Sequence, residues 1–131
     1  MTLIFCLDNH NGIMFNGRRQ SSDKAVTERI KNYANGHRLW ISAYSRKLLP
    51  VGETYFGQIQ HGDVIFAESP DLIDQCMNKV DKLIVYRWNR TYPADAVVPM
   101  ERIAENWRLE SRVEFSGNSH DLITQEVYVR E

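Results

Sequence analysis

The chain has 131 residues, of which 43% are hydrophobic and 25% are charged, and its formal net charge is −1. This length suits a single domain spanning residues 1–131, and the near-zero charge excludes a global attraction to nucleic acids or membranes. The apolar run at residues 3–7 is too short for a signal peptide or a membrane span, so we expect a cytoplasmic protein.

The first half of the chain alternates strand and helix patterns. Residues 3–7 predict a buried central strand, and residues 8–12 have turn chemistry. A helix is expected to run to about residue 33, capped by Ser21 or Ser22, with Val26, Ile30 and Tyr33 on one face. Asn35-Gly36 ends it, and residues 39–42 predict a second short strand followed by a helical turn.

The second half continues the alternation and then changes to paired strands. Residues 63–67 predict a strand, and Ser69-Pro70-Asp71 starts a helix whose apolar stripe includes Leu72 and Cys76. Residues 83–88 predict another strand. Residues 107–115 and 122–129 alternate apolar and polar around "SGNSHD", which predicts a hairpin. Trp107, Leu109, Val113 and Phe115 are expected on one face of it. The fold class is therefore α/β, a mixed sheet with flanking helices and a C-terminal antiparallel strand pair.

The order of these segments resembles dihydrofolate reductase in a shortened form. "LIFCLDNHNGI" is similar to that family's first strand and turn, and "LWISAYSRKLL" to its second strand and helix. "VIFAESPDLIDQCM" resembles the strand, glycine turn and helix that hold the cofactor's pyrophosphate, and "NWRLESRVEFSGNSHDLITQEVYVRE" resembles the closing hairpin. The resemblance implies a trimmed dihydrofolate-reductase-like fold over nearly the whole chain.

The departures from that family concern the cofactor. The paired glycines fall on Glu68 and Ser69, and Pro70 at the first helical position offers no N–H. A carboxylate here would repel a pyrophosphate. A further pair of strands that builds the adenosine half of the pocket is reduced to about residues 50–62. We therefore expect no cofactor and no redox chemistry.

The pterin side departs as well. The family's acid on the first helix falls near Ala25, with Asp23 and Glu28 close by, and a threonine that contacts the pterin falls on Tyr86. Asp23 also suits a simple role at the positive end of a helix. A residual pterin- or nucleotide-dependent enzyme using Asp23 or Glu28 stays open as an alternative.

Three segments also resemble small bacterial proteins labelled ribonuclease Z: "FNGRRQSSDKAV", "LIVYRWNRTYPAD" and "FSGNSHDLITQEVY". True ribonuclease Z is a two-metal hydrolase with a His-x-His-x-Asp-His cluster. The four histidines here, His10, His37, His61 and His120, do not have that spacing, so we expect no metal site.

The sequence contains two candidate surface sites, and each also has a simpler structural explanation. Paired arginines before a capped helix can hold an anion or nucleic acid, but they also suit a solvated basic loop. This candidate anion site comprises Arg18, Arg19, Ser21, Ser22, Arg38, Arg46 and Lys47. Interleaved aromatics and arginines can anchor a protein interface, although alternate aromatics can instead enter the core. This candidate interface comprises Tyr55, Phe56, Tyr86, Arg87, Arg90 and Tyr92, with Trp88 assigned to the core.

Two smaller features complete the candidates. His120 beside Asp121 could form an acid–base pair, although an Asn-Ser turn with local hydrogen bonds explains the segment more simply. Cys6 and Cys76 lie in apolar surroundings, which favours buried, reduced thiols.

The sequence as a whole predicts a non-catalytic binding module with a macromolecular partner, a protein more than a nucleic acid, and no membrane. By analogy, small ligand-stripped enzyme folds occur among mobile-element and phage accessory proteins, including inhibitors of host defence nucleases. An RNA- or DNA-binding protein or nuclease that uses the N-terminal basic residues is the alternative from another class.

Overall fold

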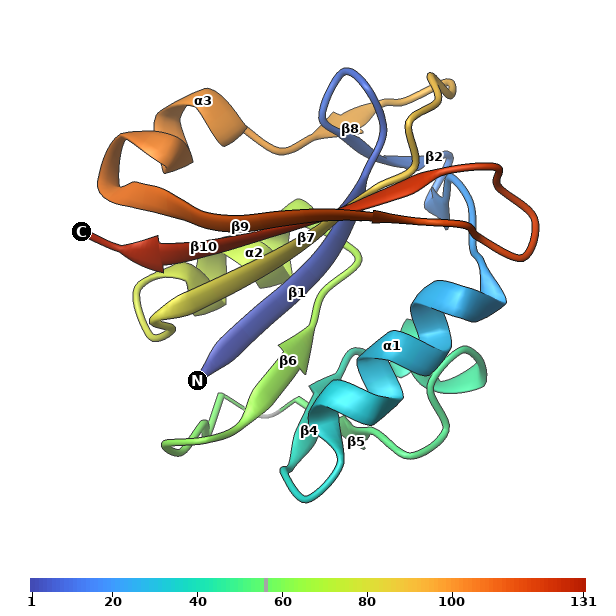
Figure 1. Ribbon diagram of the computed structural model, residues 1–131. Coiled ribbons are helices and arrows are strands. Elements are labelled where there is room, and N and C mark those ends of the chain that lie inside the picture. Colours follow the sequence, from blue (N-terminus) through green and yellow to red (C-terminus); the bar gives the residue numbers. More distant parts are fainter. Residues whose placement is uncertain (56) are drawn as a thin grey trace.

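The computed structural model describes residues 1–55 and 57–131. A seven-stranded mixed sheet forms its centre, with a small three-stranded sheet beside it (Figure 1). In chain order the elements are β1 (Thr2–Leu7), β2 (Gly12–Phe15), β3 (Arg18–Arg19), α1 (Lys24–Ala34), β4 (Leu39–Ile41), β5 (Glu53–Thr54), β6 (Val64–Phe66), α2 (Pro70–Met77), β7 (Lys82–Arg87), β8 (Ala96–Val97), α3 (Met100–Ile103), β9 (Trp107–Phe115) and β10 (Ile123–Arg130). Short 3-10 helices follow β4 at Ala43–Lys47 and α3 at Ala104–Asn106.

The strand order of the large sheet is β5-β4-β6-β1-β7-β10-β9. β1 pairs in parallel with β6 and β7, and β10 pairs antiparallel with β7 and β9. This is the mixed sheet with a C-terminal antiparallel pair that the sequence predicts. The small sheet, β3-β2-β8, and the short helix α3 were not expected, because two- to four-residue elements leave little periodicity.

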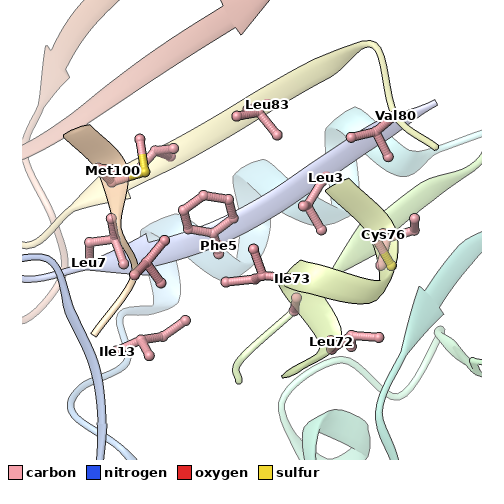
Figure 2. Close-up of a cluster of buried hydrophobic side chains, with 14 of the residues drawn as sticks. Leu3, Phe5, Leu7, Ile13, Leu72, Ile73, Cys76, Val80, Leu83 and Met100 are labelled. Atoms are coloured by element: carbon pink, nitrogen blue, oxygen red, sulfur yellow. The ribbon is translucent and has the colours of Figure 1, made fainter. Parts of the chain in front are cut away.

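β1 lies in the middle of the large sheet, and hydrophobic cores cover both of its faces. Its continuous apolar run suits a strand that is buried on both sides. Leu3, Phe5 and Leu7 point to the core under α2, where Leu72, Ile73 and Cys76 meet them (Figure 2). Ile4 belongs to a second core under α1, with Val26 and Ile30. Each fully buried side chain of this size stabilises the fold by about 1.5–3 kcal/mol.

The N-cap of α1 lies one or two residues later than predicted. Asp23, not Ser21 or Ser22, is the N-cap, and its carboxylate accepts the backbone N–H of Ala25. Asn35 and Gly36 end the helix as expected, with Gly36 at a φ of 84°. α2 has the predicted start: Ser69 Oγ accepts the N–H of Leu72, and Pro70 occupies the first turn.

The β9–β10 hairpin contains an irregularity that changes which side chains share a face. Leu109 pairs with Tyr128 and Ser111 with Val127, so Glu110 has no partner in the register. Trp107 consequently packs in the core under α2, whereas Phe115 packs against the core under α1. The expectation that Trp107, Leu109, Val113 and Phe115 share one face was wrong, since a bulge reverses the alternation.

Among the described residues, no helix combines the length and the hydropathy that crossing a bilayer requires.

Candidate functional site

The start of α1 meets the turn between β9 and β10 through a buried pair of titratable side chains. His120 Nδ1 lies 2.9 Å from Asp23 Oδ2, and both side chains are almost completely buried. Asp23 also accepts the backbone N–H groups of Asn118 and Ser119, each at 2.8 Å. One carboxylate thus caps the helix, fixes the turn and orients the imidazole.

The other nitrogen of His120 faces two hydroxyl groups. Ser21 Oγ and Tyr92 Oη each lie 3.0 Å from His120 Nε2, and Tyr92 Oη lies 3.4 Å from Ser21 Oγ. The ring of Trp88 stacks on the imidazole, with centroids 4.7 Å apart and planes 22° apart. Because Nδ1 faces a carboxylate, it carries the proton, and Nε2 is the acceptor for a hydroxyl.

The environment of Asp23 keeps it ionised. Burial raises the pKa of this carboxyl, but the N–H of Asn118, the His120 ring and the N–H groups of Ser119 and Ala25 outweigh burial. The pKa of Asp23 is therefore held far below its usual range. The sequence-based idea of a His120–Asp121 pair was wrong: Asp121 is exposed, and Asp23 takes its place from a distant segment.

A second buried cluster occupies the turn between β6 and α2. Arg19 donates to both carboxylate oxygens of Glu68, from Nε at 2.6 Å and from Nη2 at 2.9 Å. Ser45 Oγ donates to Glu68 Oε1 at 2.7 Å. The guanidinium of Arg19 also stacks over Tyr44, 4.6 Å from the ring centroid. The hydrogen bond that Arg19 donates to Glu68 raises the pKa of the Arg19 guanidinium above its usual value.

Between the two clusters lies a small cavity of about 20 Å³. It lies between the C-terminal ends of β1 and β6 and the start of α1, and this volume holds about one water molecule. Its lining includes Cys6, Ile13, Ser21, Val26, Phe66 and Glu68.

The residues of the predicted anion site do not converge on one site, because several of them contact different protein partners. Arg19 is bound to Glu68, Arg38 lies 3.8 Å from Glu53, and Arg46 donates to Thr54 Oγ1 at 2.7 Å. The remaining members have different environments: Ser21 belongs to the His120 cluster, whereas Arg18, Ser22 and Lys47 are exposed.

The predicted aromatic interface is not one exposed patch. Tyr86 is buried, with 1% of its surface exposed, and it donates to Gln125. Its expected exposure was wrong, because its β7 position faces the core under α1. Tyr55 follows the edge strand β5, whereas Arg90 and Tyr92 follow β7, with β4, β6 and β1 in between.

The other residues of the predicted aromatic interface differ in how far they are buried. Arg87 is half-buried and bonds Glu126 and Asn11, and Phe56 lies outside the described residues. Trp88 is buried as predicted. Among residues 1–55 and 57–131, no three His, Cys, Asp or Glu side chains gather as a metal site would need.

The fold can now be compared with known structures. A dihydrofolate reductase from Enterococcus faecalis, complexed with NADP(H) and RAB-propyl, matches 99% of this chain and 95% of its own, with a TM-score of 0.73. The chain has a dihydrofolate-reductase-like fold. At 12% sequence identity the likeness establishes the fold and no activity. No family model and no curated protein matches the sequence.

Within this dihydrofolate-reductase-like fold, sequence reasoning selected Ser21 as an anion ligand and Asp23 as a helix charge. It did not bring them to His120, because the contact spans 97 residues and forms only when the hairpin turn closes over α1. The residue types gave no local spacing from which to infer it.

Proposed function

We propose that this protein uses a dihydrofolate-reductase-like fold as a binding module and does not carry out nicotinamide-dependent reduction. The observation that carries this proposal is the Arg19–Glu68 ion pair at the start of α2. A dinucleotide diphosphate at this turn would need bare backbone amides and positive potential.

The residues at the turn do not fit such a group. Glu68 places a carboxylate there, and Asp71 adds a second acid in the first turn of α2. Pro70 has no N–H, and Ser69 already occupies the N–H of Leu72. Since Arg19 pairs with Glu68, its positive charge does not face the space that a diphosphate would occupy at this turn.

The neighbouring cavity supports the same proposal. Its volume of about 20 Å³ compares with roughly 300–1,000 Å³ for ordinary small-molecule sites. A pterin would require the side chains between β1, β6 and α1 to move apart. We therefore infer that the ancestral ligand space has been filled by side chains and that function resides on the outer surface.

Ligand-induced thermal stabilisation tests this proposal. We expect an unchanged melting temperature with millimolar NADPH, NADH or dihydrofolate, while an active dihydrofolate reductase measured in parallel is stabilised. The double variant Glu68→Gly/Arg19→Ala removes both charged side chains from the turn. It is the matched control for the effect of that local charge on cofactor binding. Saturable stabilisation of the wild-type chain by either cofactor would contradict the proposal.

We further propose that the partner is a protein rather than a nucleic acid, and a nuclease of a host defence system is one class to test. Cross-linking in the native host should capture a partner that is released by Arg90→Glu, at an exposed residue, or by Tyr55→Ala, at a half-buried one. Val51→Ala, at a residue that is 67% exposed, is the control. Salt-sensitive retention of labelled RNA or DNA by the wild type, lost in Arg18→Ala/Lys47→Ala, would instead favour the nucleic-acid alternative.

A further inference from the structure

The Ser21, His120 and Asp23 side chains form a chain of hydrogen-bonding groups that a binding module does not need. Ser21 Oγ lies 3.0 Å from His120 Nε2, and His120 Nδ1 lies 2.9 Å from Asp23 Oδ2. A hydroxyl, an imidazole and a buried carboxylate in this order are the arrangement in which a serine becomes a nucleophile.

We propose that Ser21 is a nucleophile activated by His120, with Asp23 as the positioning residue, and that the protein hydrolyses esters of short acyl groups. This inference goes beyond the proposed binding function and concerns the Ser21, His120 and Asp23 cluster, which borders the same small cavity. It would make the chain an enzyme, contrary to the expectation from sequence.

The three groups differ in accessibility in the way that this role requires. Ser21 is half-buried and lines the small cavity, whereas the His120 and Asp23 side chains are almost completely buried. Asp23 stays ionised because the backbone N–H groups of Asn118, Ser119 and Ala25 and the His120 ring hold its pKa below the usual range. Trp88, stacked on the imidazole, keeps water from one face of His120.

Tyr92 and Ser21 both lie within hydrogen-bond distance of His120 Nε2. One placement of their hydroxyl protons satisfies Tyr92, Ser21 and His120 together. The Tyr92 hydroxyl can donate to Ser21 Oγ over 3.4 Å, which leaves the Ser21 proton for Nε2. In the other arrangement Tyr92 donates to Nε2 and Ser21 turns away. Replacing Tyr92 with Phe therefore leaves Ser21 as the sole hydroxyl at Nε2.

The size of the acyl group follows from the cavity beside Ser21. A volume of about 20 Å³ admits a group of about one water molecule in size, which matches the methyl of an acetyl ester and no long chain. Gln20 also lines this cavity, and its buried Oε1 has no partner among the described residues. A water molecule held there by Gln20 would lie beside the acylated serine.

The reaction balances as two acyl transfers. The Ser21 Oγ–carbon bond forms as the ester C–O bond breaks, and the serine proton passes through His120 to the leaving alcohol. Water then attacks the acyl carbon and gives one proton to His120, and the Ser21 Oγ–carbon bond breaks to release the carboxylic acid. That proton returns to Ser21 Oγ, so no oxidant, reductant or metal takes part.

A fluorophosphonate probe tests the nucleophile directly, because it labels activated serines covalently. Intact-mass and peptide analysis should find one adduct on Ser21 in the wild type and in Tyr92→Phe. The adduct should be absent in Ser21→Ala and retained in Ser22→Ala, whose side chain is exposed one residue away. Absence of an adduct where trypsin is fully labelled, or an adduct on Tyr92, would overturn the proposal.

The test of Asp23 must separate a role in positioning His120 from a role in holding the fold together. In Asp23→Asn, measured well below its melting temperature, we expect the labelling rate to fall at least 100-fold while near-UV circular dichroism stays native. The release of 4-nitrophenol from its acetate should show the same order among the variants, with the butyrate ester slower. Equal labelling rates in folded Asp23→Asn and wild type would overturn the assignment of Asp23.

Discussion

The backbone N–H of Asn118 donates to Asp23 Oδ1 over 2.8 Å, across 95 residues of sequence. Since Asp23 also caps α1, this contact joins the first helix of the chain to its last hairpin. The stability of that junction depends on the charge of a single carboxylate, which makes it sensitive to acid.

Acid should weaken the fold through Asp23. Its pKa is lower in the folded chain than the value near 3.9 expected when unfolded, so the unfolded state binds more protons between the two values. The contribution is complete above about pH 5 and is lost as the pH falls below about 4. Asp23→Asn should cost about 2 kcal/mol at pH 7 and progressively less in acid, measured by urea unfolding at a series of pH values. A constant difference across pH 3–7 would contradict this account.

Breaking the Arg19–Glu68 pair should destabilise the protein more than removing it. Arg19→Ala leaves a buried carboxylate with Ser45 as its remaining hydrogen-bond partner among the described residues, and we expect a loss of about 2–3 kcal/mol. The value lies below that for fully buried pairs because 25% of the Arg19 side chain is exposed. Arg19→Ala/Glu68→Ala should regain part of the loss, and the exposed neighbour Arg18→Ala should change little. Chemical denaturation of the wild type, these variants and Glu68→Ala alone closes the double-mutant cycle, and additive losses would mean that the pair is not coupled.

Gly117 should not tolerate a side chain. A Cβ at this position would lie 2.6 Å from Asp23 Oδ2 and 2.7 Å from the His120 carbonyl oxygen, so either the turn or α1 must shift. We expect Gly117→Ala to lower the free energy of unfolding by about 1–3 kcal/mol. Ser116→Ala, at the exposed residue before it, is the matched control. Thermal unfolding of both variants makes the comparison, and equal melting temperatures would show that the turn has more room than these distances imply.

The two thiols should react slowly in the native protein. Burial raises the pKa of the Cys6 thiol, with the charge of Glu68 as a further cause, and burial also raises the pKa of Cys76. Little thiolate is therefore present at pH 8. A colorimetric disulfide reagent should modify both within minutes in denaturant and far more slowly without it. Cys6→Ser and Cys76→Ser assign the two phases, and rapid native modification of Cys6 would show that its strand opens.

The central strand β1 and the start of α2 follow from patterns that the sequence carries locally. β1 has a continuous apolar run, and Ser69-Pro70 marks the start of α2, so both were predictable from a few neighbouring residues. The start of α1 was not, because Ser21, Ser22 and Asp23 are all good caps and only the hairpin turn, packed against Asp23, decides among them.

The candidate site was less predictable than the fold for the same reason. The resemblance to a glycine turn drew attention to Glu68, but it gave no sign of the pairing with Arg19, which crosses 49 residues. The cluster around His120 combines Ser21, Trp88, Tyr92 and Asp23 from separate segments. Such a site exists only in the assembled tertiary structure, and single-residue propensities do not encode it.

The bulge at Glu110 fixes the number of residues that β9 must contain. Because the bulge lets one strand send Trp107 to one core and Phe115 to the other, deleting Glu110 would make the ladder regular and rotate half of the strand by 180°. One of the two aromatic rings would then lie in solvent. Substitutions that preserve residue count should be tolerated along this edge, whereas insertions and deletions should be selected against even where every side chain is exposed.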